Sequence, residues 1–150
     1  MDNSIKILAI ENDEFIKIFL KDVFWIHGDK NNFDFAVVDN YKKAEGCIAD
    51  LKTKPHLIFL DLFLPSPPQD KRAIVDESGF SFLEKIKSDP KTKNIKVIVF
   101  SPYGEETIKS RALKLGADKF LVKGDLLPEE IIKISEDLAV NNQNAENNAS

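Results

Sequence analysis

Four short apolar runs, each ending at a polar residue, constrain the fold of this chain more than any other feature of its sequence. The residues that end these runs are Glu11, Asp61, Ser101 and Lys123. Strands of a parallel sheet end together at one edge, and α/β folds assemble their chemistry at that edge. We therefore expect the four side chains to meet. An acid that can react, a hydroxyl, a cation and a second acid that can face a metal ion together indicate a site that handles phosphoryl groups.

The apolar runs alternate with longer stretches of helical periodicity, which predicts β-α-β units and a parallel sheet with helices on both faces. Strands are expected near residues 5–10, 33–38, 57–61, 96–101 and 119–122, and helices near 14–26, 41–52, 79–88, 105–115 and 128–140. The uniformly apolar run 57–60 places the third strand in the middle of the sheet. The buried stripe of the first helix is expected to comprise Phe15, Phe19, Val23 and Ile26.

Composition limits the classes of protein to which the chain can belong. Its 150 residues, 43% of them hydrophobic, suffice for one domain with a substantial core. A net charge of -4 provides no broad positive field for binding nucleic acid. Cys47 is the only cysteine, which excludes an intrachain disulfide and a cysteine-based zinc site. No apolar run approaches the roughly 20 residues that cross a bilayer, so we expect a cytoplasmic protein without a membrane segment.

Two segments have compositions that disfavour packed structure. From Pro65 to Gly79, three prolines, Pro65 included, and alternating charges predict a long surface loop over residues 66–78. From residue 141 the chain has almost nothing to bury, which predicts a disordered polar tail over residues 141–150. The folded domain is therefore expected to cover residues 1–140.

Four segments of the chain resemble the receiver domain of two-component response regulators, which accepts a phosphoryl group from a histidine kinase on an aspartate. The segments are residues 6–14, 57–65, 97–101 and 116–123, in the order and spacing of the family over nearly the whole chain. The resemblance implies a flavodoxin-like α/β fold with five helices and five parallel strands in the order 2-1-3-4-5. It also implies a signalling protein rather than an enzyme.

The resemblance assigns a role to each residue that matches the family pattern. These residues are Asp61 as the phosphoacceptor, Lys123 as the partner of a phosphoryl oxygen, Ser101 and Phe120 as the switch pair, and Glu11, Asn12, Asp61 and the backbone carbonyl of Phe63 as magnesium ligands. The implied partners are a histidine kinase or phosphotransfer protein, a downstream protein target, and a second copy through the face of the fourth helix, fifth strand and fifth helix.

Three departures from the family pattern bear on these implications. Asn12 stands where the family usually has an aspartate, and its neutral amide should weaken the binding of magnesium, a hard cation that favours carboxylates. Gly124 stands where proline usually follows the lysine. The long segment before Gly79 borders the active edge and could affect partner choice.

Each candidate residue also has an ordinary structural explanation. Asp61 alone could cap a turn, Ser101 could cap the helix that follows it, and Lys123 could be solvated. Phe120 alone would usually belong to the core. Their joint occurrence in the family order favours the functional interpretation.

Three functions remain open at this stage. The first is a receiver, either stand-alone or part of a longer polypeptide, that is phosphorylated on Asp61. The second is a receiver-like adaptor whose magnesium site has degenerated through Asn12 and that acts without phosphate. The third, a small α/β phosphohydrolase, is disfavoured because Phe63 stands where a second catalytic acid is expected.

Overall fold

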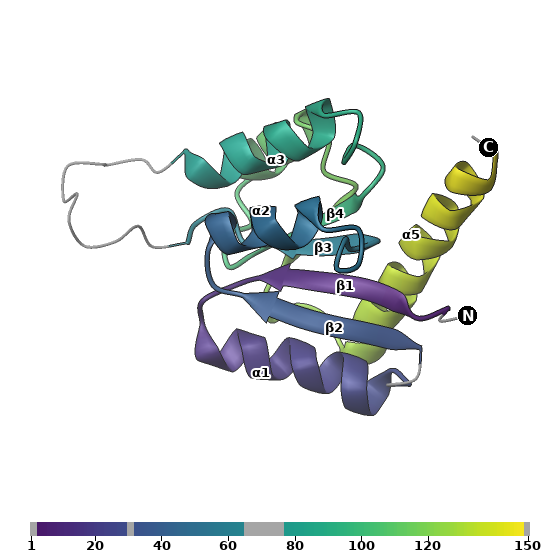
Figure 1. Ribbon diagram of the computed structural model, residues 1–150. Coiled ribbons are helices and arrows are strands. Elements are labelled where there is room, and N and C mark those ends of the chain that lie inside the picture. Colours follow the sequence, from purple (N-terminus) through teal and green to yellow (C-terminus); the bar gives the residue numbers. More distant parts are fainter. Residues whose placement is uncertain (1–2, 30–31, 65–76, 149–150) are drawn as a thin grey trace.

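The computed structural model describes residues 3–29, 32–64 and 77–148, and for residues 141–148 it describes only the backbone. The described chain forms one parallel sheet with the strand order β2-β1-β3-β4-β5 (Figure 1). The strands are β1 (Ile5–Ile10), β2 (Phe33–Val38), β3 (Leu57–Leu60), β4 (Lys96–Ser101) and β5 (Lys119–Val122). This confirms the predicted flavodoxin-like α/β fold with β3 in the centre of the sheet.

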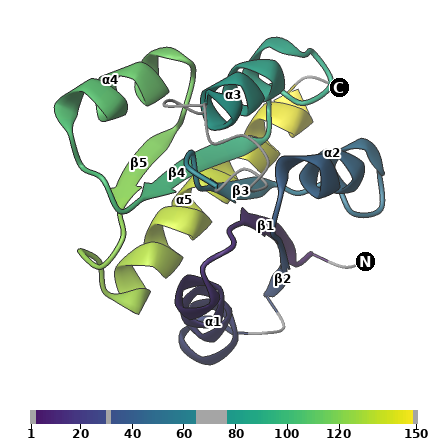
Figure 2. The ribbon, with the colours of Figure 1, turned by 90° about the vertical axis from the view of Figure 1, so that its left-hand side faces the viewer.

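Helices cover both faces of the sheet. They are α1 (Glu14–Asp22), the π-helical turn η1 (Val23–His27), α2 (Tyr41–Ala49), α3 (Ser78–Ser88), α4 (Glu106–Lys114) and α5 (Pro128–Asn148). Buried residues of α2, α3 and α4 pack on one face of the sheet, and those of α1, η1 and α5 pack on the other (Figure 2). The architecture therefore has three layers, with the sheet in the middle.

The first helix differs from its prediction because its final turn is a π-helix. The amide of Gly28 donates to the carbonyl oxygen of Val23 at 2.8 Å, so the turn is wider than an α-helical one. Phe24 is buried, and its ring lies 5.2 Å from that of Phe33. The predicted stripe was wrong at both ends: Phe15 is 83% exposed and Ile26 is 73% exposed. The wider turn shifts the residues that follow it, which accounts for the exposure of Ile26. Phe15 lies before this turn, and the residue that α1 buries is Leu20.

The C-terminal segment also differs from its prediction. Helix α5 continues to Asn148, so the backbone of residues 141–148 is helical where the sequence predicts a disordered tail. This segment contains neither proline nor glycine, and extending an existing helix adds one hydrogen bond for each residue ordered. Most of the predicted surface loop, residues 65–76, lies outside the described residues. No helix in the described part of the chain is long and apolar enough to cross a membrane.

Candidate functional site

Four polar residues lie at the carboxyl ends of the strands, on the edge of the sheet that is turned toward the viewer in Figure 2. Glu11 follows β1, Asp61 follows β3, Ser101 ends β4 and Lys123 follows β5. Glu11 is 2% exposed, Asp61 is 6% exposed and Ser101 is fully buried. Ionisable groups are rarely buried to this extent without partners, so the contacts among these residues decide what the site can do.

The ammonium group of Lys123 joins the two buried carboxylates. Its Nζ atom lies 2.6 Å from Oε2 of Glu11 and 3.2 Å from Oδ2 of Asp61. Burial of a charge is costly unless an opposite charge lies nearby, and this lysine offsets two negative charges at once. The structure thus brings together three of the residues that the sequence predicted for the site.

The carboxylate of Glu11 is held from its other side by backbone donors. Its Oε1 atom accepts hydrogen bonds from the amides of Asn12 at 3.2 Å and Asp13 at 3.1 Å. Burial raises the pKa of Glu11 above its ordinary value, and the neighbouring charge of Asp61 acts in the same direction, while the hydrogen bond from Lys123 opposes the shift. Two carboxylates this close favour any cation that can share them.

Asp61 is held by contacts to both its side chain and its backbone. Its Oδ1 atom accepts from the amide of Phe63 at 2.9 Å, and its backbone carbonyl accepts from the hydroxyl of Tyr41 at 2.7 Å. The Tyr41 ring in turn stacks on Phe82 with centroids 5.1 Å apart. Tyr41 is therefore a positioning residue that sequence reasoning missed, since a tyrosine at a helix start carries no distinctive signal.

Gly79 allows the start of α3 to approach the backbone next to Asp61. A Cβ atom at this position would lie 2.1 Å from the carbonyl oxygen of Leu62 and 2.5 Å from its Cα atom. Both are backbone atoms, which cannot move away as the end of a flexible side chain can. Glycine is therefore required at position 79 for α3 to pack against the segment that carries Asp61.

Ser101 lies at the same edge of the sheet, and its hydroxyl group forms a hydrogen bond two residues along the chain. Its hydroxyl oxygen accepts from the amide of Tyr103 at 3.0 Å, and its carbonyl oxygen accepts from the amide of Lys123 at 2.8 Å. The second bond ties the end of β4 to the residue whose ammonium contacts both carboxylates. An accepted bond leaves the hydroxyl hydrogen of Ser101 to be donated to another oxygen.

The remaining predicted residues surround this centre. Asn12 is half-buried, and Asp13 caps α1 by accepting from the amide of Ile16 at 3.0 Å. Because that carboxylate is engaged as a cap, it does not replace the charge that Asn12 lacks. The ring of Phe63 lies edge-on to Tyr103 at 5.6 Å, and Phe120 is half-buried against the core beneath α3 and α4.

An ion pair that was not predicted ties α4 to the start of α3. The guanidinium of Arg111 forms a bidentate pair with Glu77, and its Cζ atom lies 4.0 Å from the centroid of the Phe80 ring. The pair raises the pKa of Arg111 above its ordinary value through its hydrogen bond to Glu77. Both side chains are exposed, so the sequence offers no sign that they would meet.

Comparison with known proteins identifies the family. Residues 7–135 match the family model described as the response regulator receiver domain. The chain belongs to this family. The match spans most of the chain and includes every residue of the site described above. The receiver domain is a component of two-component signalling systems.

Individual relatives agree with this assignment. The domain is 27% identical over 127 residues to the phosphate regulon transcriptional regulatory protein PhoB of Escherichia coli, a match that covers 85% of this chain and 48% of PhoB. It is 27% identical over 124 residues to the chemotaxis protein CheY of Thermotoga maritima, covering 79% of this chain and 84% of CheY. The chain thus spans about half the length of the PhoB protein it matches.

Solved structures show the same fold. The CheY-like receiver domain protein from Methanospirillum hungatei JF-1 superimposes with a TM-score of 0.74 at 18% identity, over 95% of this chain and 98% of that one. The order of the strands and the sequence of helices therefore follow the known receiver architecture.

The site of this receiver domain contains oxygen atoms that could bind a hard cation, but few of them carry a negative charge. In the described ranges no three histidine, cysteine, aspartate or glutamate side chains gather in a way that could hold a metal ion. Glu11 and Asp61 each bring a buried carboxylate oxygen to the ammonium of Lys123, and Asn12, which follows Glu11 in the chain, is half-buried. Oxygen donors of this kind suit magnesium, which binds through one or two carboxylates and retains several waters.

The turn after Lys123 departs from the usual receiver sequence and also from its backbone conformation. Gly124 has a φ of 89°, in the left-handed region that favours glycine. Proline, which the family usually has at this position, is fixed near -65° and could not adopt this conformation. The turn that follows Lys123 is therefore one that glycine, and not proline, can form.

Proposed function

We propose that this receiver domain accepts a phosphoryl group on Asp61 from a histidine kinase or phosphotransfer protein and signals by binding another protein. The observation that carries the proposal is the contact of Lys123 with both buried carboxylates. A carboxylate nucleophile, a fixed cation beside it and a buried hydroxyl on the next strand are the groups that phosphoryl transfer uses.

The transfer step follows from the position of Asp61. A carboxylate oxygen of Asp61 attacks the phosphorus atom of a phosphohistidine, an O–P bond forms and the N–P bond breaks. The electron pair of the broken bond stays on the histidine nitrogen, which then takes up a proton. Lys123 offsets negative charge on the transferring oxygens, and this electrostatic help is the main contribution a protein makes to such a step.

A magnesium ion would be held by Glu11, Asp61, the side-chain oxygen of Asn12 and the backbone carbonyl of Phe63. When bound, it would offset the repulsion between the Asp61 carboxylate and the incoming phosphoryl oxygens. Lys123 performs part of that neutralisation without a metal, because its ammonium already contacts both carboxylates. We expect magnesium to bind more weakly here than in receivers with an aspartate at the position of Asn12.

The switch would run through Ser101 and Phe120. Donation of the Ser101 hydroxyl to a phosphoryl oxygen would draw the loop after β4 inward, and Phe120 would turn into the space released. The surface of α4, β5 and α5 would change as a result. We propose this surface as the contact for the downstream protein or for a second copy of the domain, with Leu113 of α4 supplying exposed apolar area.

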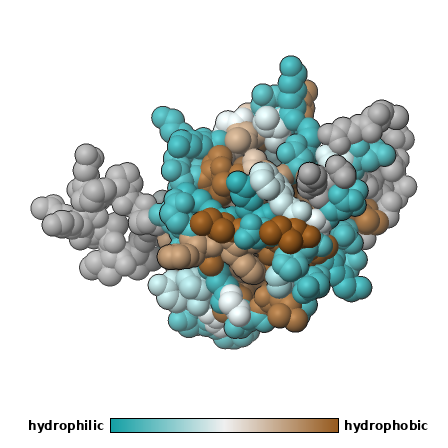
Figure 3. Space-filling model, turned by 90° about the horizontal axis from the view of Figure 1, so that it is seen from below, coloured by the Kyte–Doolittle hydropathy of each residue, from teal (hydrophilic) through white to brown (hydrophobic). Residues whose placement is uncertain are grey.

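A patch of exposed apolar side chains supports docking of the phosphoryl donor. The α1 patch comprises Phe15 and Ile18 of α1 and Trp25 and Ile26 of η1, which are 50–83% exposed. Figure 3 shows the face that carries α1, with brown apolar side chains gathered between polar ones. Contiguous exposed apolar area of this kind marks protein-binding surfaces. Helix α1 begins at Glu14, three residues after Glu11, so a partner bound over its first turn would lie at the edge of the sheet that carries Asp61.

A second candidate function follows from Asn12. If the neutral amide and the engaged Asp13 leave the metal site too weak, the domain would act as an adaptor that binds its partner without phosphate. Magnesium titration separates the two functions. Labelling that needs the substitution Asn12→Asp would favour the adaptor, and labelling of the unaltered protein would favour the phosphorylated receiver.

The direct test of phosphorylation uses acetyl phosphate with magnesium and the mass of the intact protein. We expect a gain of one phosphoryl group that is absent in Asp61→Ala. No gain in the parent, or the same gain in Asp61→Ala, would contradict the proposal. The domain is proposed to be a cytoplasmic signalling protein and not an enzyme, so turnover of a generic phosphate ester that depends on Asp61 would contradict that part of the account.

A further inference from the structure

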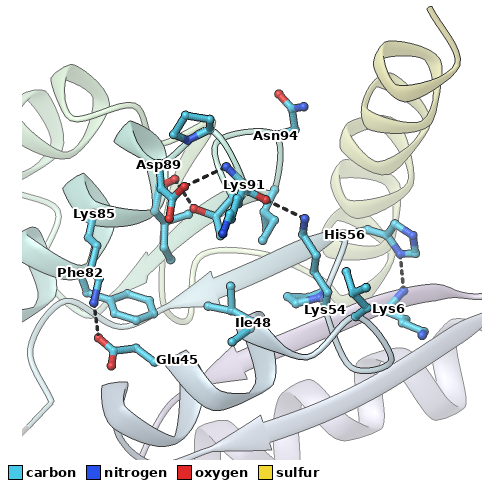
Figure 4. Close-up of a pocket in the computed structure, with 17 residues that line it drawn as sticks. Lys6, Glu45, Ile48, Lys54, His56, Phe82, Lys85, Asp89, Lys91 and Asn94 are labelled. Atoms are coloured by element: carbon cyan, nitrogen blue, oxygen red, sulfur yellow. Dashed lines mark hydrogen bonds and ion pairs between the residues drawn. The ribbon is translucent and has the colours of Figure 1, made fainter. Parts of the chain in front are cut away.

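A cavity of about 860 Å³ opens between α2 and α3, at the edge of the sheet opposite Asp61 (Figure 4). Lys6 at the start of β1, His56 before β3 and Ile95 before β4 line it, which places it at the amino ends of the strands. The volume lies within the range of about 300–1,000 Å³ typical of small-molecule sites. Neither the phosphoryl chemistry nor the protein contacts proposed above use this cavity.

The inner wall of the cavity is apolar. Ile48 of α2 and Phe82 and Ile86 of α3 line it, and all three side chains are buried in the core. Pro55 and Ile95, both buried, continue this wall toward the sheet. Leu51 lies at the rim and is 87% exposed, an unusual position for a leucine. An apolar body placed in the cavity would contact the accessible edge of this wall and cover Leu51, which removes apolar surface from water.

The rim of the cavity carries an excess of positive charge. Four lysines line it, Lys6, Lys54, Lys85 and Lys91, against two acids, Glu45 and Asp89. The ammonium of Lys85 pairs with Glu45 at 3.0 Å. The other acid serves the turn after α3, where its Oδ1 atom accepts from the backbone amide of Lys91 at 2.9 Å. This local excess contrasts with the net charge of -4 of the whole chain.

Two of the rim ammonium groups are fixed in place by backbone carbonyls. Lys6 Nζ donates to the carbonyl of Lys52 at 2.6 Å, and Lys54 Nζ donates across the cavity to the carbonyl of Lys91 at 2.7 Å, a bond drawn in Figure 4. An ammonium group has three donors, so each of these bonds leaves further protons for a ligand. Anchored cations lose less side-chain freedom when an anion binds than freely moving ones do.

We propose that this cavity binds a small amphipathic anion, with an apolar body against Ile48, Phe82 and Ile86 and an acidic group held by Lys54 and Lys91. An inorganic anion would leave the apolar wall exposed to water, and a cation of the same shape would face the excess of lysines. The ligand class is therefore an organic molecule that combines an aliphatic or aromatic body with one carboxylate, sulfonate or phosphate.

The test compares two probes with the same apolar chain and opposite charge. Octanoate and octylamine are titrated separately into the ¹⁵N-labelled protein, and the backbone amide shifts are followed by NMR. We expect octanoate to cause saturable shifts confined to α2, α3 and the segments before β3 and β4, and octylamine to cause none there. Equal effects of the two probes, or octanoate shifts scattered over the surface, would overturn the proposal.

Substitutions at the rim provide the matched controls. Lys54→Gln and Lys91→Gln should each weaken octanoate binding about threefold, the scale of a partly exposed ion pair. Ala49→Phe, at an exposed position of the lining, should block the cavity mouth and abolish the shifts. Lys133→Gln, on an exposed face of α5, should bind octanoate as the parent does. Unchanged affinity in both rim lysine variants would overturn the proposal.

Binding at this cavity does not depend on phosphorylation. Asp61→Ala should bind octanoate with the affinity of the parent, because the reactive edge lies at the other end of the strands. The failure of either proposal would therefore leave the other intact.

Discussion

Lys123 Nζ lies 2.6 Å from Oε2 of Glu11 and 3.2 Å from Oδ2 of Asp61, so the lysine contacts the carboxylate of Glu11 more closely than that of Asp61. One ammonium group therefore stabilises two buried charges. The consequences of this relationship can be measured in the protein itself.

Removal of the lysine should destabilise the fold. In Lys123→Gln both buried carboxylates lose their cation, and the free energy of unfolding at pH 7 should fall by about 3 kcal/mol, as when one partner of a buried ion pair is removed. Urea denaturation measures the change. Magnesium should restore more stability to this variant than to the parent, because the two uncompensated carboxylates then bind the cation more strongly. Lys133→Gln, on the exposed face of α5, should change stability by less than about 0.5 kcal/mol.

Glu11 should make stability depend on pH in a defined direction. Its pKa is raised in the folded protein above the ordinary value of 4.5, mainly by burial, so the folded state binds a proton there more tightly than the unfolded state does. The contribution of this proton to the stability of the fold is complete below the pKa that Glu11 has in the unfolded state. It is lost as the pH rises through the higher pKa that Glu11 has in the folded state.

The variant Glu11→Gln isolates this effect, because a neutral amide does not titrate. The free energy of unfolding of the variant minus that of the parent should increase as the pH rises through this window, because only the parent has the raised pKa of Glu11. Urea unfolding at a series of pH values measures the difference. A difference that stays constant, or that decreases with rising pH, would contradict the raised pKa.

Two glycines in helices should respond oppositely to alanine. Gly79→Ala places a Cβ atom against the backbone of Leu62 and should cost several kcal/mol, since packed backbone must move. Gly46 of α2 has nothing within 4 Å of the added atom, so Gly46→Ala should stabilise the protein by up to about 1 kcal/mol. Thermal unfolding of the two variants measures the contrast. Similar losses at both positions would refute the close approach of α3 to Leu62.

Restoring a charge beside Glu11 should strengthen metal binding. Asn12→Asp adds a third carboxylate to the two already present, and we expect at least a tenfold gain in magnesium affinity, equal to about 1.4 kcal/mol. Isothermal titration with magnesium measures it. Asn94→Asp adds the same charge at the opposite edge of the sheet and should leave the affinity unchanged. A similar gain in both variants would indicate a general effect of net charge.

The strands and most helix bounds could be predicted because the spacing of apolar residues and the local composition indicate the same elements along the chain. The runs before Asp61 and Ser101 are uniformly apolar, as central parallel strands must be, and proline or glycine marks several boundaries. The π-turn at Val23–His27 was not predictable, because it depends on how Phe24 packs between α1 and the sheet. The helical backbone of residues 141–148 was missed because the polar composition of this segment indicates only that it has little to bury. Composition does not show whether a preceding helix continues.

The site was predictable to the extent that its residues end strands. Parallel strands must bring Glu11, Asp61 and Lys123 to one edge, whereas the position of Tyr41, the first residue of α2, relative to Asp61 depends on how α2 packs. The same limit applies to Gly79, whose role requires the backbone of Leu62 to be placed first. Contacts that depend on packing between distant elements leave no local pattern in the sequence.

The most direct test of the account is to locate the phosphoryl group after labelling with acetyl phosphate and magnesium. Borohydride reduces an aspartyl phosphate to homoserine, and peptide mass spectrometry then identifies the altered residue. The account predicts homoserine at position 61 and at no other aspartate, with less of it formed in Lys123→Gln. Homoserine at another aspartate, or none at position 61 in a folded and labelled protein, would contradict it.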